Sequence, residues 1–248
     1  MFSLVAWSES QDSSVLVNVA ALADPHIRVN GDDVIVPTDL QALVGAYAVG
    51  LNVTRAQLVS PSLRRYLNFE IAPFDLATEP VVPTAFIDLR RNPIILDPEE
   101  ALDAQAAENG AGAIRSTIFA WLADKALEPV TGDIRTVRVT NASTLAASAW
   151  TNGALTFDQT LPAGEYAVVG GRFVSAGLQG WRCVFVGQQW RPGAIGYDLD
   201  NDIEHPAFRY GQMGVWGTFR HNTPPTIDFL SVSADTSQTG ELDLMKIS

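Results

Sequence analysis

Short stretches in which apolar residues alternate with polar ones, or cluster with β-branched and aromatic residues, recur along the whole chain. They are separated by turn-forming pairs and triplets such as Asn30-Gly31, Asn152-Gly153, Pro162-Ala163-Gly164 and Pro192-Gly193. This pattern is typical of β-sandwiches and β-barrels. Strands are predicted near residues 2–7, 14–20, 27–29, 34–36, 67–72, 84–89, 113–122, 134–140, 155–157, 166–175, 181–186, 207–210, 215–219, 226–233 and 241–247.

Helical signals are few. Asp97 is a suitable N-cap, Pro98 suits the first helical position, and the alanine-rich stretch 101–109 precedes Gly110. These features predict a helix that begins at Pro98, includes the stretch 101–109 and ends before Gly110. A second short helix is predicted from Ser60-Pro61 through Arg65. Both are expected in loops, and they are too few for a doubly wound α/β fold.

A faint internal repeat divides the chain into halves. Gly45–Val49 reads Gly-Ala-Tyr-Ala-Val, and Gly164–Val168 reads Gly-Glu-Tyr-Ala-Val, about half a chain length later. Asn30-Gly31 and Asn152-Gly153 precede the two copies at similar distances. Chance is the alternative, because Gly, Ala and Val are abundant here. If the repeat is real, the all-β chain consists of two tandem jelly-roll domains with short loop helices, residues 1–129 and 130–248.

The charge balance limits the partners of this chain. It holds 28 acidic against 16 basic residues, for a net charge of −12, and no long basic cluster. Direct coating of nucleic acid or of an anionic membrane is therefore not expected. No apolar run approaches the ~18 residues of a membrane span, and no basic region precedes an apolar stretch at the N-terminus. We expect a soluble protein that is not exported by a signal peptide.

The sequence offers no catalytic constellation. His26, His205 and His221 are scattered, and neither a closely spaced histidine pair nor a nucleophile elbow or phosphate-binding loop appears. Cys183 is the sole cysteine and shares a predicted strand face with Trp181 and Phe185, so a buried hydrophobic role is expected. We predict no enzyme, no catalytic residues and no cofactor other than a cation.

One acidic segment is a candidate site for a cation. Asp198, Asp200, Asp202 and Glu204 alternate with other residues between Tyr197 and His205. In an extended segment their carboxylates would lie on one side and would suit a hard cation such as calcium. The spacing is not that of an EF-hand, because Ile203 and Arg209 occupy the Gly and Glu positions. The alternative is a solvated surface loop paired with Arg191 or Arg209.

Contacts between subunits are predicted at six residues. Trp190 and Arg191 lie beside Pro192, outside an obvious core strand, and tryptophan and arginine are enriched at interface hot spots. The pairs Arg64-Arg65 and Arg90-Arg91 are the strongest local basic groups on an acidic chain. We expect them to meet carboxylates of neighbouring subunits. Trp181 and Trp216, in contrast, are predicted core residues.

The chain resembles the double jelly-roll major capsid proteins of tailless icosahedral phages. The resemblance rests mainly on the C-terminal half, on residues 161–169, 189–193, 214–217, 227–230 and 241–244. It implies a homotrimer whose six sandwiches form a near-hexagonal building block that contacts neighbouring trimers and other virion proteins. It also implies synthesis in the host cytoplasm, a location in the virion, and in some such virions a membrane beneath the shell.

Two alternatives remain open. A carbohydrate-binding jelly roll of lectin type would need an aromatic platform on one sheet face, and alternation along the strands predicts none. A vertex or spike protein of the same kind of virion would differ by forming pentamers or protruding trimers.

Overall fold

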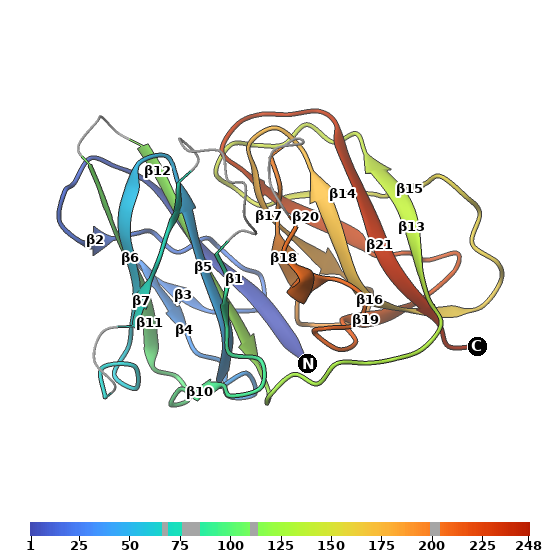
Figure 1. Cartoon of the computed structure of the whole chain (residues 1–248), viewed down its shortest axis with the longest axis horizontal. Coiled ribbons are helices and arrows are strands. Elements are labelled where there is room, and N and C mark those ends of the chain that lie inside the picture. Colours follow the sequence, from blue (N-terminus) through green and yellow to red (C-terminus); the bar gives the residue numbers. More distant parts are fainter. Residues whose placement is uncertain (66–68, 76–84, 110–113, 199–203) are drawn as a thin grey trace. The chain divides into compact units, whose positions relative to one another are not determined.

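The computed structural model describes residues 1–65, 69–75, 85–109, 114–198 and 204–248. It is almost entirely β-structure and divides into two compact units (Figure 1). We call the described residues between 3 and 126 the N-terminal sandwich, and the described residues between 127 and 248, with Met1 and Phe2, the C-terminal sandwich. The change between units falls between β12 (Ile114–Ala123) and β13 (Ile134–Asn141). The all-β fold class is as predicted.

The C-terminal sandwich has the strand order of a jelly roll. In its described residues one sheet has the order β15-β13-β21-β16-β19 and the other the order β14-β20-β17-β18. The antiparallel pairs are nested: β13 with β21, β14 with β20, β16 with β19, and β17 with β18. A long hairpin rolled up into two sheets has this connectivity. Besides β13, the strands are β14 (Thr151–Gly153), β15 (Thr156–Phe157), β16 (Glu165–Val174), β17 (Leu178–Val184), β18 (Gly193–Ile195), β19 (Gly217–Arg220), β20 (Thr226–Ser231) and β21 (Gln238–Lys246).

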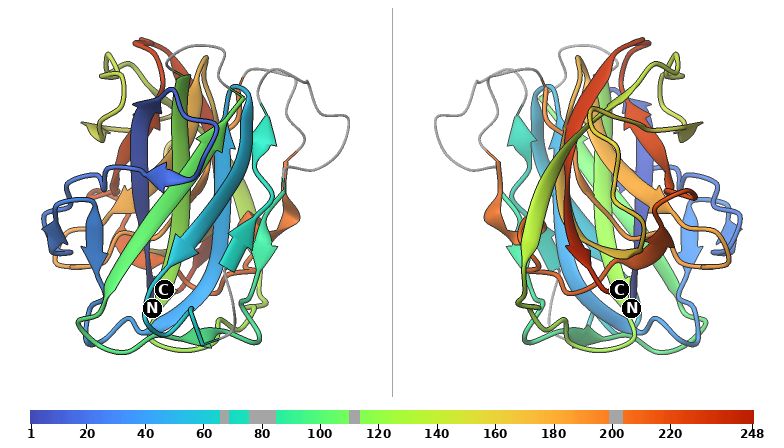
Figure 2. Two further views of the ribbon diagram at one scale, coloured as in Figure 1. Left: turned by 90° about the vertical axis from the view of Figure 1, so that its left-hand side faces the viewer. Right: turned by 90° about the vertical axis from the view of Figure 1, so that its right-hand side faces the viewer.

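The N-terminal sandwich repeats the nested order. Its described strands form the sheets β1-β12-β5-β10, with β8 and β9 also on β5, and β3-β4-β11-β6-β7, with β2 on β11. Figure 2 shows the long strands lying side by side within each sandwich. The strands are β1 (Phe2–Gln11), β2 (Val17–Asn18), β3 (Val29–Asn30), β4 (Asp33–Ile35), β5 (Ala42–Gly50), β6 (Val53–Val59), β7 (Phe69–Ile71), β8 (Phe74–Asp75), β9 (Ile87–Asp88), β10 (Ile94–Ile95), β11 (Ala101–Glu108) and β12.

The two tyrosines of the faint repeat occupy equivalent strands. Tyr47 lies in β5 and Tyr166 in β16, and each strand is central in the corresponding sheet of its own sandwich. The Asn-Gly pairs are not equivalent. Asn30-Gly31 forms the turn between β3 and β4, whereas Asn152-Gly153 lies inside β14. The predicted turn at Asn152-Gly153 is therefore wrong.

Aromatic side chains fill the C-terminal core. The ring of Phe173 packs edge-on against Trp181 and Phe229, with centroids 4.7 and 5.1 Å apart. Trp181 also packs against Trp216, with centroids 5.2 Å apart. The predicted burial of Trp181, Trp216 and Cys183 is confirmed. Burial, and to a smaller extent the charge of Asp228, raises the pKa of the Cys183 thiol, so this cysteine is an inert core residue.

Both predicted loop helices are absent from the described chain. Residues 101–108 form β11, in which Leu102, Ala104 and Ala106 point inward while Asp103 and Gln105 alternate with them. Pairing with β6 and inward burial outweigh the helix propensity of alanine, which is a weak preference. The segment after Ser60 forms a turn, closed by a bond from the Arg64 N–H to the Ser60 carbonyl.

A predicted strand near 207–210 is also wrong. Pro206–Phe208 forms a 3₁₀ turn, η1, in which the His205 side chain accepts a hydrogen bond from the Ala207 amide. Among the described residues, no helix is long and apolar enough to cross a membrane.

Candidate functional site

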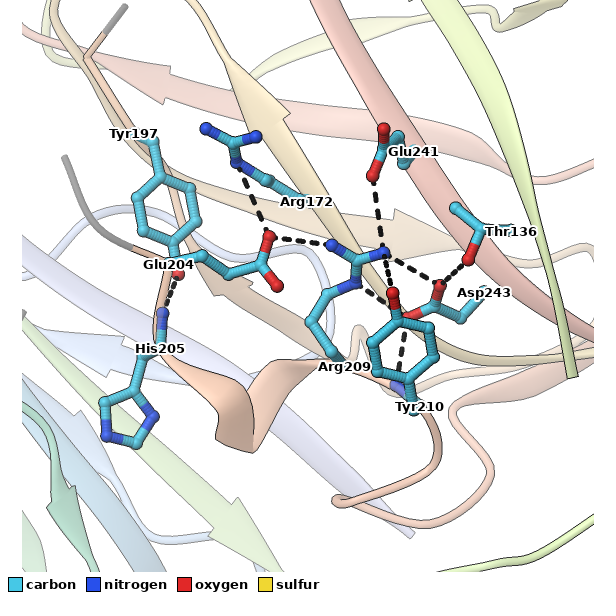
Figure 3. A network of polar contacts seen from close by, with 9 residues as sticks. All are labelled: Thr136, Arg172, Tyr197, Glu204, His205, Arg209, Tyr210, Glu241 and Asp243. Carbon is cyan, nitrogen blue, oxygen red and sulfur yellow. Dashed lines mark hydrogen bonds and ion pairs between the residues drawn. The ribbon is translucent and has the colours of Figure 1, made fainter. Parts of the chain in front are cut away.

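The most extensive polar network of the C-terminal sandwich lies on the outer face of its β13-β21-β16 sheet (Figure 3). Alternation along β21 sends Leu242 and Leu244 into the core and Asp243 to the opposite face. Register places Thr136 of β13 and Gly170 of β16 directly opposite Asp243. Asp243 has no solvent exposure, although a carboxylate on an outer sheet face would ordinarily be hydrated.

The connecting segment 204–216, between β18 and β19, covers this part of the sheet. A β-bulge at residues 168–170 of β16 interrupts the ladder with β21. The carbonyls of Val168 and Val169 accept bonds from the Trp216 and Gly211 amides, at 2.8 Å each. Gly170 lacks a side chain that would obstruct the segment, because a Cβ there would lie 2.6 Å from the Phe208 carbonyl oxygen. The bulge and the glycine therefore allow the segment to approach the sheet.

Arg209 fastens the connecting segment to Asp243. Its Nε and Nη2 donate to the two carboxylate oxygens at 2.8 and 3.1 Å, a bidentate contact. Thr136 Oγ1 donates to the same carboxylate at 2.7 Å, and the Tyr210 amide donates at 2.9 Å. Burial on its own would lower the pKa of the Arg209 guanidinium. Hydrogen bonding to Asp243, with the charges of Asp243 and Glu204, outweighs burial and raises it, so Arg209 stays charged.

Two further carboxylates extend the network toward solvent. Glu204 accepts from Arg209 Nη1 at 2.7 Å and lies 3.6 Å from Arg172 Nε. Glu241 lies 3.3 Å from Arg209 Nη2. The Arg172 guanidinium also lies over the Tyr197 ring, 5.5 Å from its centroid. Three carboxylates and two arginines thus share contacts, and Arg209 is central to them.

Tyr210 is held in an uncommon conformation at the edge of this network. Its φ of 49° lies in the left-handed region, where bulky residues are rare. The Arg209 guanidinium lies 4.7 Å from its ring centroid, and the Tyr210 backbone amide is bound by Asp243. These contacts compensate for the backbone strain. The side chain is 55% exposed, so the network presents an aromatic ring to solvent.

A second charged cluster crosses the other sheet of the same sandwich. Asp228 of β20 lies opposite Arg182 of β17 and Asn152 of β14. It accepts from Arg182 Nε at 2.9 Å, from Arg191 Nη1 at 2.5 Å and from the Asn152 amide at 2.8 Å. The Arg182 guanidinium lies 4.2 Å from the Trp150 ring centroid, which shields it further.

Both networks link separate strands or segments of the C-terminal sandwich to a buried carboxylate. In each, arginines donate hydrogen bonds at short range to a buried carboxylate, so the carboxylate oxygens are occupied. Within the described residues, no three His, Cys, Asp or Glu side chains gather closely enough to hold a metal ion.

The predicted cation site falls partly outside the described residues, because Asp200 and Asp202 lie in 199–203. Of the other two members, Asp198 is partly buried, and Glu204 binds Arg209. The alternative prediction, an acidic segment paired with Arg209, is thus found at Glu204. A calcium ion at the four carboxylates stays a prediction.

The predicted interface residues have different surroundings. Arg65 pairs with Asp97, and Arg90 with Asp88, each at 2.7 Å within the chain, while Arg64 and Arg91 are exposed. Arg191 belongs to the Asp228 cluster. Trp190 is only 4% exposed, so little of its ring is left for a partner, and its burial does not support the predicted anchor. Contacts of the five arginines, Arg191 included, with neighbouring subunits stay predictions.

Sequence reasoning named Arg209 as a partner of the acidic segment but missed Asp243 and its contact with Arg209. In the run Glu241-Leu242-Asp243-Leu244 the alternation predicts a hydrated carboxylate, and this parity is correct. The local pattern contains no sign that a segment 34 residues away along the chain covers that face and brings Arg209 to it. The one available signal was the glycine-rich sequence around residues 211–214, which indicates a tightly turned segment.

Comparison with known proteins gives few matches. No family model matches the sequence, and no curated protein does. The crystal structure of the major capsid protein P2 from bacteriophage PM2 is similar over 100% of this chain and 98% of that chain, with 10% sequence identity and a TM-score of 0.25. A TM-score of this size carries no argument about the role of this chain.

Proposed function

We propose that this protein is a structural shell subunit, the major capsid protein of a tailless icosahedral phage, which associates as a homotrimer. One observation carries the proposal: the nested jelly-roll order occurs twice within one chain of 248 residues. Jelly rolls are frequent in viral capsid proteins. Three chains would supply six sandwiches, which suits a near-hexagonal building block. Assembly in the virion would follow synthesis in the host cytoplasm.

The polar networks support a structural role. Asp243 and Asp228 are both buried, and arginines tie each of them across strands of one sheet or to a covering segment. Such buried pairs contribute little net stability, but breaking one is costly, so they hold a single arrangement of strands and segment. A shell subunit needs a defined surface for identical contacts in every copy. The proposal includes no catalytic role.

The exposure of aromatic residues favours the shell over a carbohydrate-binding module. Among the described aromatic side chains, only that of Tyr210 is largely exposed to solvent. A sugar platform needs several exposed rings on one face, and a single tyrosine does not provide it.

Native mass spectrometry of the purified protein, followed by negative-stain electron microscopy at high protein concentration, tests the proposal. We expect a homotrimer and, on concentration, sheets or closed particles with near-hexagonal units. A protein that stays monomeric under all these conditions would contradict the proposal. Pentamers would instead indicate a vertex protein, and specific binding on a glycan array would favour the lectin alternative.

A further inference from the structure

A row of three charged residues crosses the outer face of the β13-β21-β16 sheet. It lies beside Asp243, at the preceding position of β21 on the same face. Arg138 of β13 and Arg172 of β16 both lie directly opposite Glu241 of β21. We call Arg138, Glu241 and Arg172 the arginine row. Because three adjacent strands fix its register, the backbone spacing of the two arginines is rigid. Side chains on such a scaffold are positioned before any partner arrives.

The connecting segment 204–216 leaves this row partly open. Arg138 is exposed, while Arg172 and Glu241 keep 30% and 38% of their side-chain surface. A depression of about 100 Å³ lies between them and is completed by Val174, Thr239 and Gly240. A carboxylate group consists of one carbon and two oxygen atoms and is small enough to enter a space of this size.

The positive charges of the row are not fully matched by carboxylates in the residues that the structure describes. Among the described residues, Arg138 forms neither an ion pair nor a side-chain hydrogen bond. Within the described part of the chain, Arg172 has one ion pair, with Glu204 at 3.6 Å, which is beyond hydrogen-bond distance, and its buried Nε has no hydrogen-bond partner there. Figure 3 shows both Nη atoms of Arg172 pointing away from Glu204. Glu241 contacts Arg209 instead.

We propose that the arginine row binds a carboxylate side chain of a second copy of this chain. Arg138 and Arg172 would each donate to the incoming carboxylate, and the Thr239 hydroxyl lines the same depression. The occupant follows from charge: the chain has 28 acidic and 16 basic residues, so a neighbouring copy offers mostly carboxylates. Two copies at −12 repel each other, and a site of this kind supplies a local attraction in a defined register. The inference rests on the proposed function, because it concerns the contact between shell subunits.

Charge reversal at the open end of the row tests the site. Arg138→Glu should raise the dissociation constant of the oligomer roughly tenfold or more, measured by native mass spectrometry and sedimentation velocity at several protein concentrations. Arg220→Glu is the matched control. Arg220 is exposed on β19 of the same sheet, and it too has no ion pair among the described residues. Its charge change is identical, so a general charge effect would appear equally in both variants.

A second variant identifies the occupant. Arg138→Lys keeps the positive charge and introduces an amine that a carbodiimide couples to a carboxylate in direct contact. We expect an intermolecular amide bond between position 138 and an Asp or Glu of another copy, located by peptide mass spectrometry, and none at position 220 in Arg220→Lys. Circular dichroism of each variant verifies folding.

The outcomes separate this inference from the proposed function. An oligomer that is unchanged by Arg138→Glu, or weakened equally by Arg220→Glu, overturns the arginine row as a contact while leaving the shell proposal intact. A wild-type protein that is monomeric throughout overturns both. An intramolecular amide bond at position 138 would overturn the inter-copy site alone.

Discussion

Arg209 and Asp243 are the clearest case in which single residues control the arrangement around them. Asp243 is fully buried, and Arg209 is 4% exposed. Each compensates the charge of the other, with Thr136 and the Tyr210 amide occupying the remaining carboxylate positions. Taking two charges out of water costs about as much as their attraction returns. The pair therefore acts less as a source of stability than as a constraint on where the segment lies.

Removing one partner of this pair should lower the free energy of unfolding strongly. Arg209→Met keeps most of the side-chain volume but leaves Asp243 buried without a counter-charge. We expect it to lower the free energy of unfolding by about 3–5 kcal/mol, measured by urea denaturation. Arg138→Met, on the exposed part of the same face, should change it by less than about 0.5 kcal/mol. A loss below about 1 kcal/mol in Arg209→Met would mean that Asp243 finds other compensation.

Asp103 of β11 imposes a pH dependence on the N-terminal sandwich. Burial, and then the nearby charges of Asp33 and Asp32, raise the pKa of this carboxyl from 3.8 to about 6. The folded pKa lies above the unfolded value, so the folded state binds the proton more tightly. The contribution of Asp103 to stability is therefore unfavourable above pH 6 and is relieved as the pH falls toward about 4.

Asp103→Asn removes this titration. We expect the variant to be more stable than the wild type by about 1–2 kcal/mol at pH 7.5, after allowance for solvent screening at a partly exposed group. At pH 4.5 most of that gain should be absent, because the wild-type carboxyl is then protonated in the folded state. Urea denaturation of both proteins at the two pH values measures the difference. An equal gain at both would show that the charge of Asp103 is not responsible.

Among the elements, β16 and the connecting segment 204–216 depend on each other. The bulge at 168–170 turns two strand carbonyls toward the segment, and Gly170 provides room for it. The segment in turn buries a sheet face that would otherwise be hydrated. The bulge in β16 thus helps to determine where the connection after β18, two strands further along the chain, is placed.

Gly170→Ala should disturb this packing. The added methyl group would lie 2.6 Å from the Phe208 carbonyl, so we expect a loss of about 1–3 kcal/mol in the free energy of unfolding. Hydrogen exchange gives a local readout, in which the amides of Gly211 and Trp216 should lose protection. In Gly187→Ala the φ of 77° strains the backbone locally, but the methyl group would meet nothing within 4 Å, so local protection at those amides should be unchanged. Retained protection in Gly170→Ala would show that the segment tolerates the displacement.

At the scale of the whole molecule, the net charge of −12 opposes the association of copies. Screening by salt weakens long-range repulsion more than short contacts between partly buried groups. We therefore expect the oligomer to dissociate more at about 20 mM salt than at about 300 mM, measured by sedimentation velocity. Stronger association at low salt would mean that attractive pairs such as those at the arginine row outweigh the net repulsion.

The sequence by itself determined the class of structure. Period-two alternation and turn chemistry are local properties, and they located most of the long strands, the burial of Trp181 and Trp216, and the equivalence of Tyr47 and Tyr166. Inward and outward parity along β21 was also readable from the sequence, because neighbouring side chains on a strand must point to opposite faces.

Only the tertiary structure decided which faces are covered and which charges meet. The stretch 101–108 has helix-forming residues, yet its pairing with β6 makes it a strand. Thr136 and Asp243 lie 107 residues apart in sequence, and Arg209 reaches them from a different connection. Sheet order, a bulge and the path of one segment bring these groups together. Each depends on long-range packing and not on local preference, so no local pattern distinguished the buried Arg209 from the exposed Arg138.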